Sequence, residues 1–244
     1  MALERLLRTG RTFIIAEVGT AHRGDRSRAL DLVDAAADAG ADCVKTQIVY
    51  ADEIVHRKTG LVELPGGAVP LWERFRELEA EPQLFADMAE GCRRRGITFL
   101  ASCFGPRSLK ELIALGAEAV KIASPELNHL PLLEAVRDAG LDVFFSTGVS
   151  TLGDIETALG AVAPQPAAIL HCVTAYPAPP EEYNLRLVGA LASIFGHPVG
   201  VSDHSLDPIL IPTVAAALGA VCLEKHFTLE RSGGGLDDPI ALEP

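Results

Sequence analysis

Residues 39–45, Ala39-Gly40-Ala41-Asp42-Cys43-Val44-Lys45, contain a pattern that recurs along the chain: a helix ends in glycine, and a short apolar strand then ends in a polar residue. Glycine suits the left-handed residue that ends a helix, and the apolar run suits a parallel strand covered on both faces. The pattern returns at 95–101, 115–121, 139–145 and 218–224. The chain is therefore predicted to be a series of α/β units.

The length and the hydrophobic content fit one barrel. A chain of 244 residues with 48% hydrophobic content can bury a large core, and its length suits one (β/α)8 barrel better than two small domains. Apolar runs predict strands near 12–18, 42–48, 97–102, 118–123, 142–146, 167–172, 198–202 and 220–227. Start and stop signals predict helices near 27–39, 82–95, 106–115, 130–139, 151–162, 183–195 and 207–218. The predicted fold is an α/β TIM (β/α)8 barrel, a single domain over residues 1–244, without its last outer helix.

Two segments do not fit the repeated unit. Residues from about 50 to 81 are too many for an ordinary strand-to-helix loop and include Leu64-Pro65-Gly66-Gly67, so we interpret them as an insertion over the mouth of the barrel. Residues 232–239 are rich in glycine, and no helical pattern follows them. We expect an uncovered flank there, which a second copy in a homodimer or a partner segment would cover.

The composition excludes several classes of protein. The net charge of -12 repels nucleic acid and anionic membranes, so a phosphorylated substrate would need a local cluster of lysine or arginine. No apolar stretch is long enough for a secretion signal or a membrane span. The five cysteines have no CxxC spacing and fit reduced core thiols. We expect a cytoplasmic protein without nucleic-acid or membrane partners.

Two histidines, His204 and His226, stand at the ends of two neighbouring predicted strands. The carboxyl ends of barrel strands meet at one face, where barrel enzymes carry their chemistry. Two imidazoles, with an oxygen from Glu17 or Asp237, would suit a divalent ion such as Mn, Mg or Zn. The alternative is a pair of buried histidines that are hydrogen-bonded to the backbone.

Two lysines, Lys45 and Lys121, also end predicted strands, and serines and a Ser146-Thr147-Gly148 turn accompany them. Cations neutralise a phosphate while hydroxyl and backbone N–H groups supply directed donors, so the set predicts a phosphate site. Each lysine by itself would most often be a solvated strand end. Glu17 could simply cap a loop, Tyr176 could be a packing residue, and Asp203 could orient His204.

Seven short motifs together carry a resemblance to a known family. They are Ile14-Ile15-Ala16-Glu17-Val18-Gly19, Val44-Lys45-Thr46-Gln47, Lys121-Ile122-Ala123-Ser124-Pro125-Glu126, Ser146-Thr147-Gly148, His171-Cys172-Val173-Thr174-Ala175-Tyr176-Pro177, Ser202-Asp203-His204 and Glu224-Lys225-His226-Phe227-Thr228. In this order the chain resembles the N-acetylneuraminate (sialic acid) synthase family from about Phe13 to Pro244. That family also contains the legionaminate and pseudaminate synthases and spore-coat polysaccharide proteins.

The resemblance implies a metal-dependent condensation of phosphoenolpyruvate with an N-acetylhexosamine aldehyde, which gives a nonulosonic acid and phosphate. N-acetylmannosamine is the default acceptor. By position, His204 and His226 would bind the metal, most simply Mn²⁺, with Mg²⁺ or Co²⁺ as alternatives. The substrate-binding residues would be Lys45, Gln47, Lys121, Ser124, Ser146, Thr174 and Ser202. The residues that orient the sugar or move protons would be Glu17, Glu126, Tyr176 and Asp237.

The chain departs from the family pattern in two places. Family members usually continue into a last barrel helix and a small antifreeze-like domain, whose arginine reaches the partner subunit's sugar site, and neither follows here. We therefore expect this chain to bind phosphoenolpyruvate and metal but to be impaired as a catalyst. The loop usually written Pro-Gly-Pro-Asp is Gly234-Gly235-Leu236-Asp237, so Asp237 is retained in a looser loop.

Two other functions remain open from the sequence. A Schiff-base aldolase on the same barrel would use Lys45 or Lys121 and needs no metal, which the histidine pair argues against. A catalytically weak sugar-binding or regulatory paralogue would keep the fold without the reaction, because a fold by itself does not establish activity.

Overall fold

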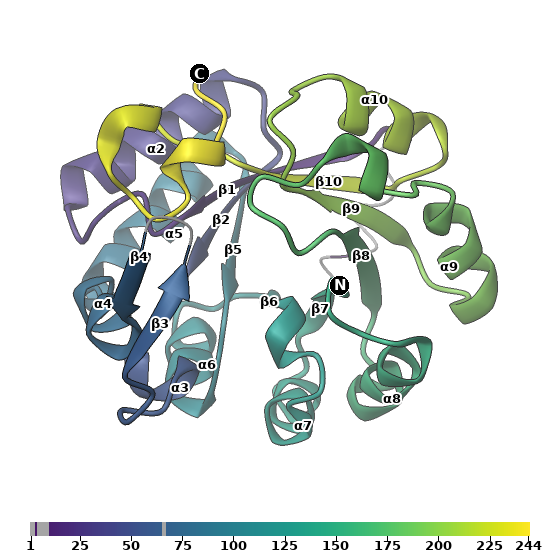
Figure 1. Ribbon diagram of the computed structural model, residues 1–244, viewed down its shortest axis with the longest axis horizontal. Coiled ribbons are helices and arrows are strands. Elements are labelled where there is room, and N and C mark those ends of the chain that lie inside the picture. Colours follow the sequence, from purple (N-terminus) through teal and green to yellow (C-terminus); the bar gives the residue numbers. More distant parts are fainter. Residues whose placement is uncertain (1–2, 4–9, 65–66) are drawn as a thin grey trace.

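The computed structural model describes residue 3, residues 10–64 and residues 67–244. Eight parallel strands close into a barrel in the order β1-β10-β9-β8-β7-β6-β5-β2 (Figure 1). The strands are β1 (Phe13–Gly19), β2 (Cys43–Gln47), β5 (Thr98–Ser102), β6 (Ala119–Ile122), β7 (Asp142–Ser146), β8 (Ala167–Cys172), β9 (Val199–Asp203) and β10 (Cys222–His226). Each overlaps a strand expected from the sequence, and the predicted TIM barrel is confirmed.

Seven helices connect these strands on the outside of the barrel (Figure 1). They are α2 (Arg26–Asp38), α5 (Pro82–Arg95), α6 (Pro106–Ala114), α7 (Leu130–Asp138), α8 (Leu152–Val162), α9 (Leu187–Phe195) and α10 (Leu210–Ala217). Helix α8 begins where the sequence predicts, because Thr151 and Asp154 form a reciprocal capping box. Helix α10 begins later than expected, since the Asp207 carboxylate accepts the backbone N–H groups of Ile209 and Leu210 and holds a turn before the helix.

The segment between β2 and α5 has secondary structure of its own, which periodicity did not predict. It contains α3 (Ala51–Ile54), an antiparallel pair β3 (Leu61–Leu64) and β4 (Gly67–Pro70), and α4 (Leu71–Glu77). Residues 65 and 66 of the predicted Leu64-Pro65-Gly66-Gly67 turn lie outside the described residues. The Glu53 carboxylate accepts the backbone N–H groups of Arg107 (2.5 Å) and Ser108 (3.1 Å), which attaches this segment to the start of α6.

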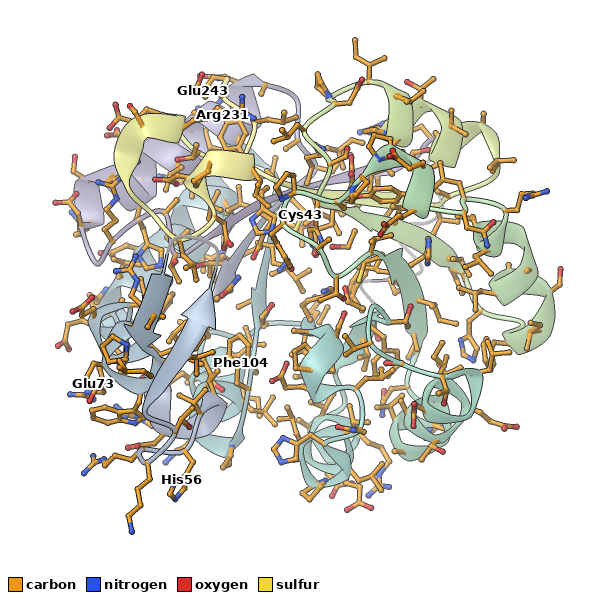
Figure 2. The ribbon with its side chains drawn as sticks, viewed as in Figure 1. Cys43, His56, Glu73, Phe104, Arg231 and Glu243 are labelled. Atoms are coloured by element: carbon orange, nitrogen blue, oxygen red, sulfur yellow. The ribbon has the colours of Figure 1, made fainter. Side chains whose placement is uncertain are left out.

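The core has two parts. One lies between the strands and the outer helices, and the other fills the barrel itself below its carboxyl-terminal face. The residues of the inner part are Leu3, Phe13, Ile15, Cys43, Leu100, Ala119, Phe144, Ala168, Leu170 and Cys222. Figure 2 shows Cys43 near the centre of the ring of strands. All five cysteines are buried and free, as the sequence predicts for core thiols.

The contact between β5 and β6 is the weakest seam that the structure describes in the barrel. Its register contains one residue pair, Ser102 with Lys121, whereas the other barrel pairs have three to five. Beside the starts of these strands, Arg93, Phe99 and Glu118 help to line a cavity of about 480 Å³. Strands β5 and β6 are thus paired only near their carboxyl ends, at Ser102 and Lys121.

Residues 227–244, all of which the structure describes, contain two 3-10 turns, η3 (Arg231–Gly233) and η4 (Asp238–Ile240), and no α-helix. This segment returns to the barrel, because Phe227 pairs with Leu242 and the Glu243 carboxylate accepts the backbone N–H of Arg231 (Figure 2). Within the described ranges, no helix has the length and apolar character that a bilayer crossing requires.

Candidate active site

Strand register places the polar side chains of the site on the inside of the barrel. Side chains alternate along a strand, so Glu224 and His226 of β10 share the inward face with the buried Cys222. Glu17 of β1 is the Cα partner of both His226 and Lys45. The ends of β10, β1 and β2 therefore bring a carboxylate, an imidazole and an ammonium group together, although they lie far apart in sequence.

Two lysines and two glutamates form a buried ion cluster at this face. The Lys45 ammonium nitrogen lies 2.8 Å from a Glu17 oxygen and 3.5 Å from Glu224 Oε2. The Lys121 ammonium nitrogen lies 3.5 Å from Glu224 Oε1. All four residues are at most 5% exposed. Two positive and two negative charges thus compensate one another where water is nearly excluded.

Serine hydroxyls surround the two ammonium groups. Lys45 donates to Ser102 Oγ (3.2 Å) and Lys121 donates to Ser146 Oγ (2.6 Å). Ser202 donates to Glu224 Oε1 (2.8 Å). The structure therefore brings the predicted Lys45, Lys121, Ser146 and Ser202 into one cluster of cations and hydroxyls, which is the donor set that a phosphate or carboxylate ligand requires.

Burial and the ion pairs shift the pKa values of this cluster in opposite directions. Burial lowers the pKa of Lys45, but Glu17 and Glu224 outweigh burial and leave that pKa above its ordinary value. Burial also lowers the pKa of Lys121, and here Glu224 offsets the effect only in part. Burial alone would raise the pKa of Glu224, yet the ammonium groups of Lys121 and Lys45 hold it well below its usual range.

The two predicted metal ligands are neighbours. The rings of His204 and His226 lie 5.6 Å apart between centroids, and the Tyr176 ring stacks on His204 at 4.2 Å and meets His226 edge-on at 6.2 Å. Burial and the nearby His226 lower the pKa of His204 to about 4, so its imidazole is neutral at physiological pH. A carbonyl oxygen only accepts, so His204 Nδ1, 2.8 Å from Val173 O, carries the proton and Nε2 keeps its lone pair.

The residues present fit a divalent ion held by two imidazoles. A neutral imidazole whose other nitrogen is bonded to a carbonyl oxygen is the usual form of a histidine ligand. Among the described residues, no group of three or more His, Cys, Asp and Glu side chains is arranged to hold one metal ion. The remaining ligands would therefore come from water or substrate, as in metal sites with open positions.

Glu17, Gln47 and Asp237 meet around Gly19. Gln47 Nε2 donates to Glu17 Oε1 (3.0 Å), and Asp237 Oδ2 lies 3.8 Å from His226 Nδ1. A Cβ atom placed on Gly19 would lie 3.3–3.5 Å from side-chain atoms of all three. The Glu17 carboxylate is thus engaged with Lys45 and Gln47, and Asp237 stands beside the histidine pair.

Three other predicted residues, Ser124, Thr174 and Glu126, lie beside the cluster and, in the described part of the chain, form neither a hydrogen bond nor an ion pair with its lysines. Ser124 Oγ accepts the backbone N–H of Gly148 (3.0 Å) and lies 3.3 Å from Cys172 Sγ, while a Cβ on Gly148 would meet Thr174 Oγ1 at 2.1 Å. Glu126 follows β6, and its buried Oε2 has no hydrogen-bond partner among the residues that the structure describes. Burial raises the pKa of Glu126 to about 7, which suits a group that holds a proton near neutral pH.

The sequence reasoning missed two members of the cluster, Glu224 and Ser102. Glu224 lies two residues before His226 in the same strand and therefore on the same face. For Asp203, a role in orienting His204 stays a prediction. Its carboxylate bonds to Tyr183 and Lys225, while the His204 ring bonds to Val173 O.

The chain is similar to known proteins. The model of the NeuB family matches residues 32–244. The chain is 38% identical to the spore coat polysaccharide biosynthesis protein SpsE of Bacillus subtilis over 95% of its own length and 64% of that relative's length. It is 35% identical to N,N'-diacetyllegionaminic acid synthase of Legionella pneumophila, over 95% of this chain and 68% of that protein. The chain thus spans about two thirds of these relatives.

A solved structure agrees with the whole barrel. The N-acetylneuraminic acid (sialic acid) synthetase of Leptospira borgpetersenii, in complex with citrate, superimposes with a TM-score of 0.88 at 35% identity, over 96% of this chain and 79% of that one. A family model that covers most of the chain, together with relatives above 30% identity, identifies the family. The chain belongs to the NeuB family.

Proposed function

We propose that this chain carries the active face of a sialic-acid-type synthase, which condenses phosphoenolpyruvate with an N-acetylhexosamine aldehyde to give a nonulosonic acid and phosphate. The single observation that carries the proposal is the buried cluster of Lys45 and Lys121 with serine hydroxyls, beside the neighbouring pair His204 and His226. The names of the relatives, which include legionaminic, pseudaminic and N-acetylneuraminate-9-phosphate synthases, support this reaction class.

Phosphoenolpyruvate would bind across the lysine cluster. Its phosphate and carboxylate groups would accept hydrogen bonds from Lys45 and Lys121 and from the hydroxyls of Ser146 and Ser202, with Ser124 and Thr174 at the edge of the site. Gln47, Tyr176 and Asp237 would orient the acceptor sugar above it. In the reaction, C3 of phosphoenolpyruvate bonds to the aldehyde carbon, water adds to C2, and the C2–O bond to phosphate breaks.

His204 and His226 would hold a divalent ion, most simply Mn²⁺, with Mg²⁺ or Co²⁺ as alternatives. Such an ion polarises the aldehyde oxygen of the acceptor and so favours attack on its carbon. The charge balance also supports a cation here, because Glu17 and Glu224 already neutralise the two lysines. A substrate with two anionic groups would otherwise enter a site that has no net positive charge.

Proton transfer would fall to Glu126. A carboxyl with a pKa of about 7 exists in both protonation states at neutral pH, and its Oε2 is free of other hydrogen bonds. The Glu17 carboxylate, held by Lys45 and Gln47, would fix the ammonium group of Lys45 toward the substrate.

The test is phosphate release in a mixture of the protein, phosphoenolpyruvate, Mn²⁺ and a panel of N-acetylhexosamines. We expect slow release that requires both a sugar and the metal, and that disappears in His204→Ala. Omission of the sugar measures plain hydrolysis. Binding of phosphoenolpyruvate without turnover of any sugar would support the sugar-binding or regulatory paralogue instead, and absence of phosphoenolpyruvate binding would refute the proposal.

One observation favours a second candidate, imine formation on Lys121. Burial lowers the pKa of this lysine, and a lowered pKa leaves more of the neutral amine that attacks a carbonyl group. Borohydride reduction in the presence of a carbonyl substrate would trap a covalent adduct in an aldolase. We expect no adduct, because Lys121 donates to Ser146 and faces Glu224, which favour its charged form.

A further inference from the structure

His204 receives four contacts from one segment, residues 173–183, between β8 and α9. Val173 O accepts from His204 Nδ1 (2.8 Å), and the backbone N–H of Ala178 donates to His204 O (3.0 Å). The Tyr183 hydroxyl accepts the backbone N–H of His204 (2.7 Å), and the Tyr176 ring stacks on the imidazole at 4.2 Å. The position of the ring therefore depends on how firmly this segment is held.

Tyr183 is the residue that anchors the segment. Its side chain is 1% exposed, and its hydroxyl donates to Asp203 Oδ1 (2.6 Å) while accepting from His204 N. Its carbonyl oxygen lies 2.6 Å from His171 Nε2, which donates to it from β8. One tyrosine thus joins the end of β8, the end of β9 and the segment between them.

The carboxylate of Asp203 is in turn held from the next strand. Asp203 Oδ1 accepts the backbone N–H of Ser205 (2.8 Å), and Asp203 Oδ2 accepts from Lys225 Nζ (2.7 Å) of β10. Lys225 also donates to the carbonyl oxygen of Ser205. The turn His204-Ser205 is consequently held at both residues: Tyr183 accepts the backbone N–H of His204, and Lys225 donates to the carbonyl oxygen of Ser205.

We infer that Tyr183, Asp203 and Lys225 form a positioning clamp that sets the His204 ring for its cation. The inference rests on the proposed function, because it assigns to the clamp the orientation of a metal ligand. A buried hydrogen-bond network with several charged members has one low-energy arrangement, which makes it suitable for holding a ligand in place. None of the three side chains need touch the substrate or the cation.

The chain offers a matched control for the tyrosine hydroxyl. Tyr50 is also buried, and its hydroxyl also donates to a carboxylate, that of Glu111 in α6, outside both the segment 173–183 and the turn His204-Ser205. Tyr183→Phe and Tyr50→Phe therefore remove the same kind of bond. A general loss of stability would appear in both variants, whereas an effect on His204 would appear in Tyr183→Phe alone.

The first readout is NMR of the ¹⁵N-labelled, metal-free protein. The Nδ1–H of His204, bonded to Val173 O, should give a protected imidazole signal that His204→Gln identifies by its loss. We expect this signal to broaden or vanish in Tyr183→Phe and to persist in Tyr50→Phe. An unchanged signal in a folded Tyr183→Phe variant would overturn the clamp.

The second readout is calorimetric Mn²⁺ binding, which we expect to weaken about tenfold in Tyr183→Phe, at the lower end of the usual effect of partners behind a metal ligand. If Tyr183→Phe does not fold, Lys225→Met tests the clamp from its other side with the same two readouts. Wild-type protein that binds no Mn²⁺ would refute the metal assignment of the proposed function, and the metal-free NMR signal would still decide the clamp.

Discussion

At the scale of single residues, the site is governed by compensation of buried charge. Lys45, Lys121, Glu17 and Glu224 are each at most 5% exposed, and each lies within 3.5 Å of an opposite charge. Removal of one partner from such a set leaves an uncompensated charge, which costs more than the pair contributes. Substitutions here should therefore change both ligand binding and stability, and the two effects have to be measured separately.

Lys45→Met and Lys121→Met should each weaken phosphoenolpyruvate binding by about 1.5–3 kcal/mol, the range for hydrogen bonds to charged groups. Lys45→Met should also lower the free energy of unfolding more than Lys121→Met, because Lys45 contacts two carboxylates and Lys121 contacts one. Calorimetric titration and denaturant unfolding measure the two effects, with the exposed Lys58→Met as control. Wild-type affinity in both variants would contradict the assignment.

Glu126 should make stability depend on pH. Its pKa is about 7 when folded and near the ordinary 4.5 when unfolded, so the folded state binds more protons between these values and stability falls as pH rises through them. Glu126→Gln should remove this cost and raise the free energy of unfolding at pH 8 by about 1–3 kcal/mol. The gain should disappear below pH 4.5. The exposed Glu134→Gln is the control, and an equal gain in both variants would refute this explanation.

At the scale of elements, the end of β1 shows how backbone geometry concentrates polar groups. The register between β1 and β2 shifts between Glu17 and Gly19, and Gly19 has a φ of +49°. The missing side chain lets Glu17, Gln47 and Asp237 approach one another around the glycine. A glycine at this bulge thus has two functions, a left-handed backbone and an empty volume.

A comparison of Gly19→Ala with Gly24→Ala separates the effect of the left-handed backbone from the effect of the empty volume. Both glycines have positive φ, but a Cβ at Gly24 meets nothing within 4 Å. The backbone strain of about 1–2 kcal/mol should appear in both variants. Gly19→Ala should lose additional stability and should weaken substrate binding, because Gln47 Nε2 lies 3.3 Å from the added Cβ and must shift by a few tenths of an ångström. Equal losses in chemical denaturation, with unchanged binding, would show that the close approach is unimportant.

The seam between β5 and β6 should be the first part of the barrel to open locally. One register pair and an adjacent cavity leave few hydrogen bonds across it, whereas β8 and β9 share four register pairs. Native-state hydrogen exchange should therefore be faster for amides of β5 and β6 that face the seam than for those between β8 and β9. Uniform protection around the barrel would contradict this prediction.

At the scale of the whole molecule, an acidic protein encloses a site that, under the proposed function, binds an anionic substrate. The net charge is -12, and the lysines of the site are already neutralised by two glutamates. Long-range electrostatics therefore do not attract an anionic substrate. Binding instead depends on short, directed contacts inside the barrel and, under the proposed function, on the additional charge of a divalent ion.

Mn²⁺ should stabilise the wild-type protein and should fail to stabilise His204→Ala or His226→Ala. An ion that binds only the folded state contributes about 2.7 kcal/mol at one hundred times its dissociation constant. Thermal unfolding with and without Mn²⁺ measures the difference, and the exposed His56→Ala should respond as the wild type does. If both His204→Ala and His226→Ala bind Mn²⁺ as tightly as the wild type, the two histidines are not the metal ligands.

The order and position of the barrel elements follow from the sequence alone. Apolar runs locate all eight barrel strands to within about two residues, because a buried parallel strand needs a continuous apolar stretch. Five of these runs follow a helix-ending glycine, which suits the left-handed residue before the strand. The same pattern placed Lys45, Lys121, His204 and His226 at strand ends, since the carboxyl ends of parallel strands share one face.

Only the tertiary structure decided how these residues are paired. Glu224 lies between two lysines that precede it by more than 100 residues, and Tyr183 reaches Asp203 from a loop without regular periodicity. The late start of α10 likewise depends on local side-chain bonds, those that the Asp207 carboxylate accepts from the backbone. The periodicity of apolar residues in the sequence predicts which face of a strand or helix a side chain occupies. Distances between residues of different strands depend on register and barrel closure, which arise only when the whole core packs.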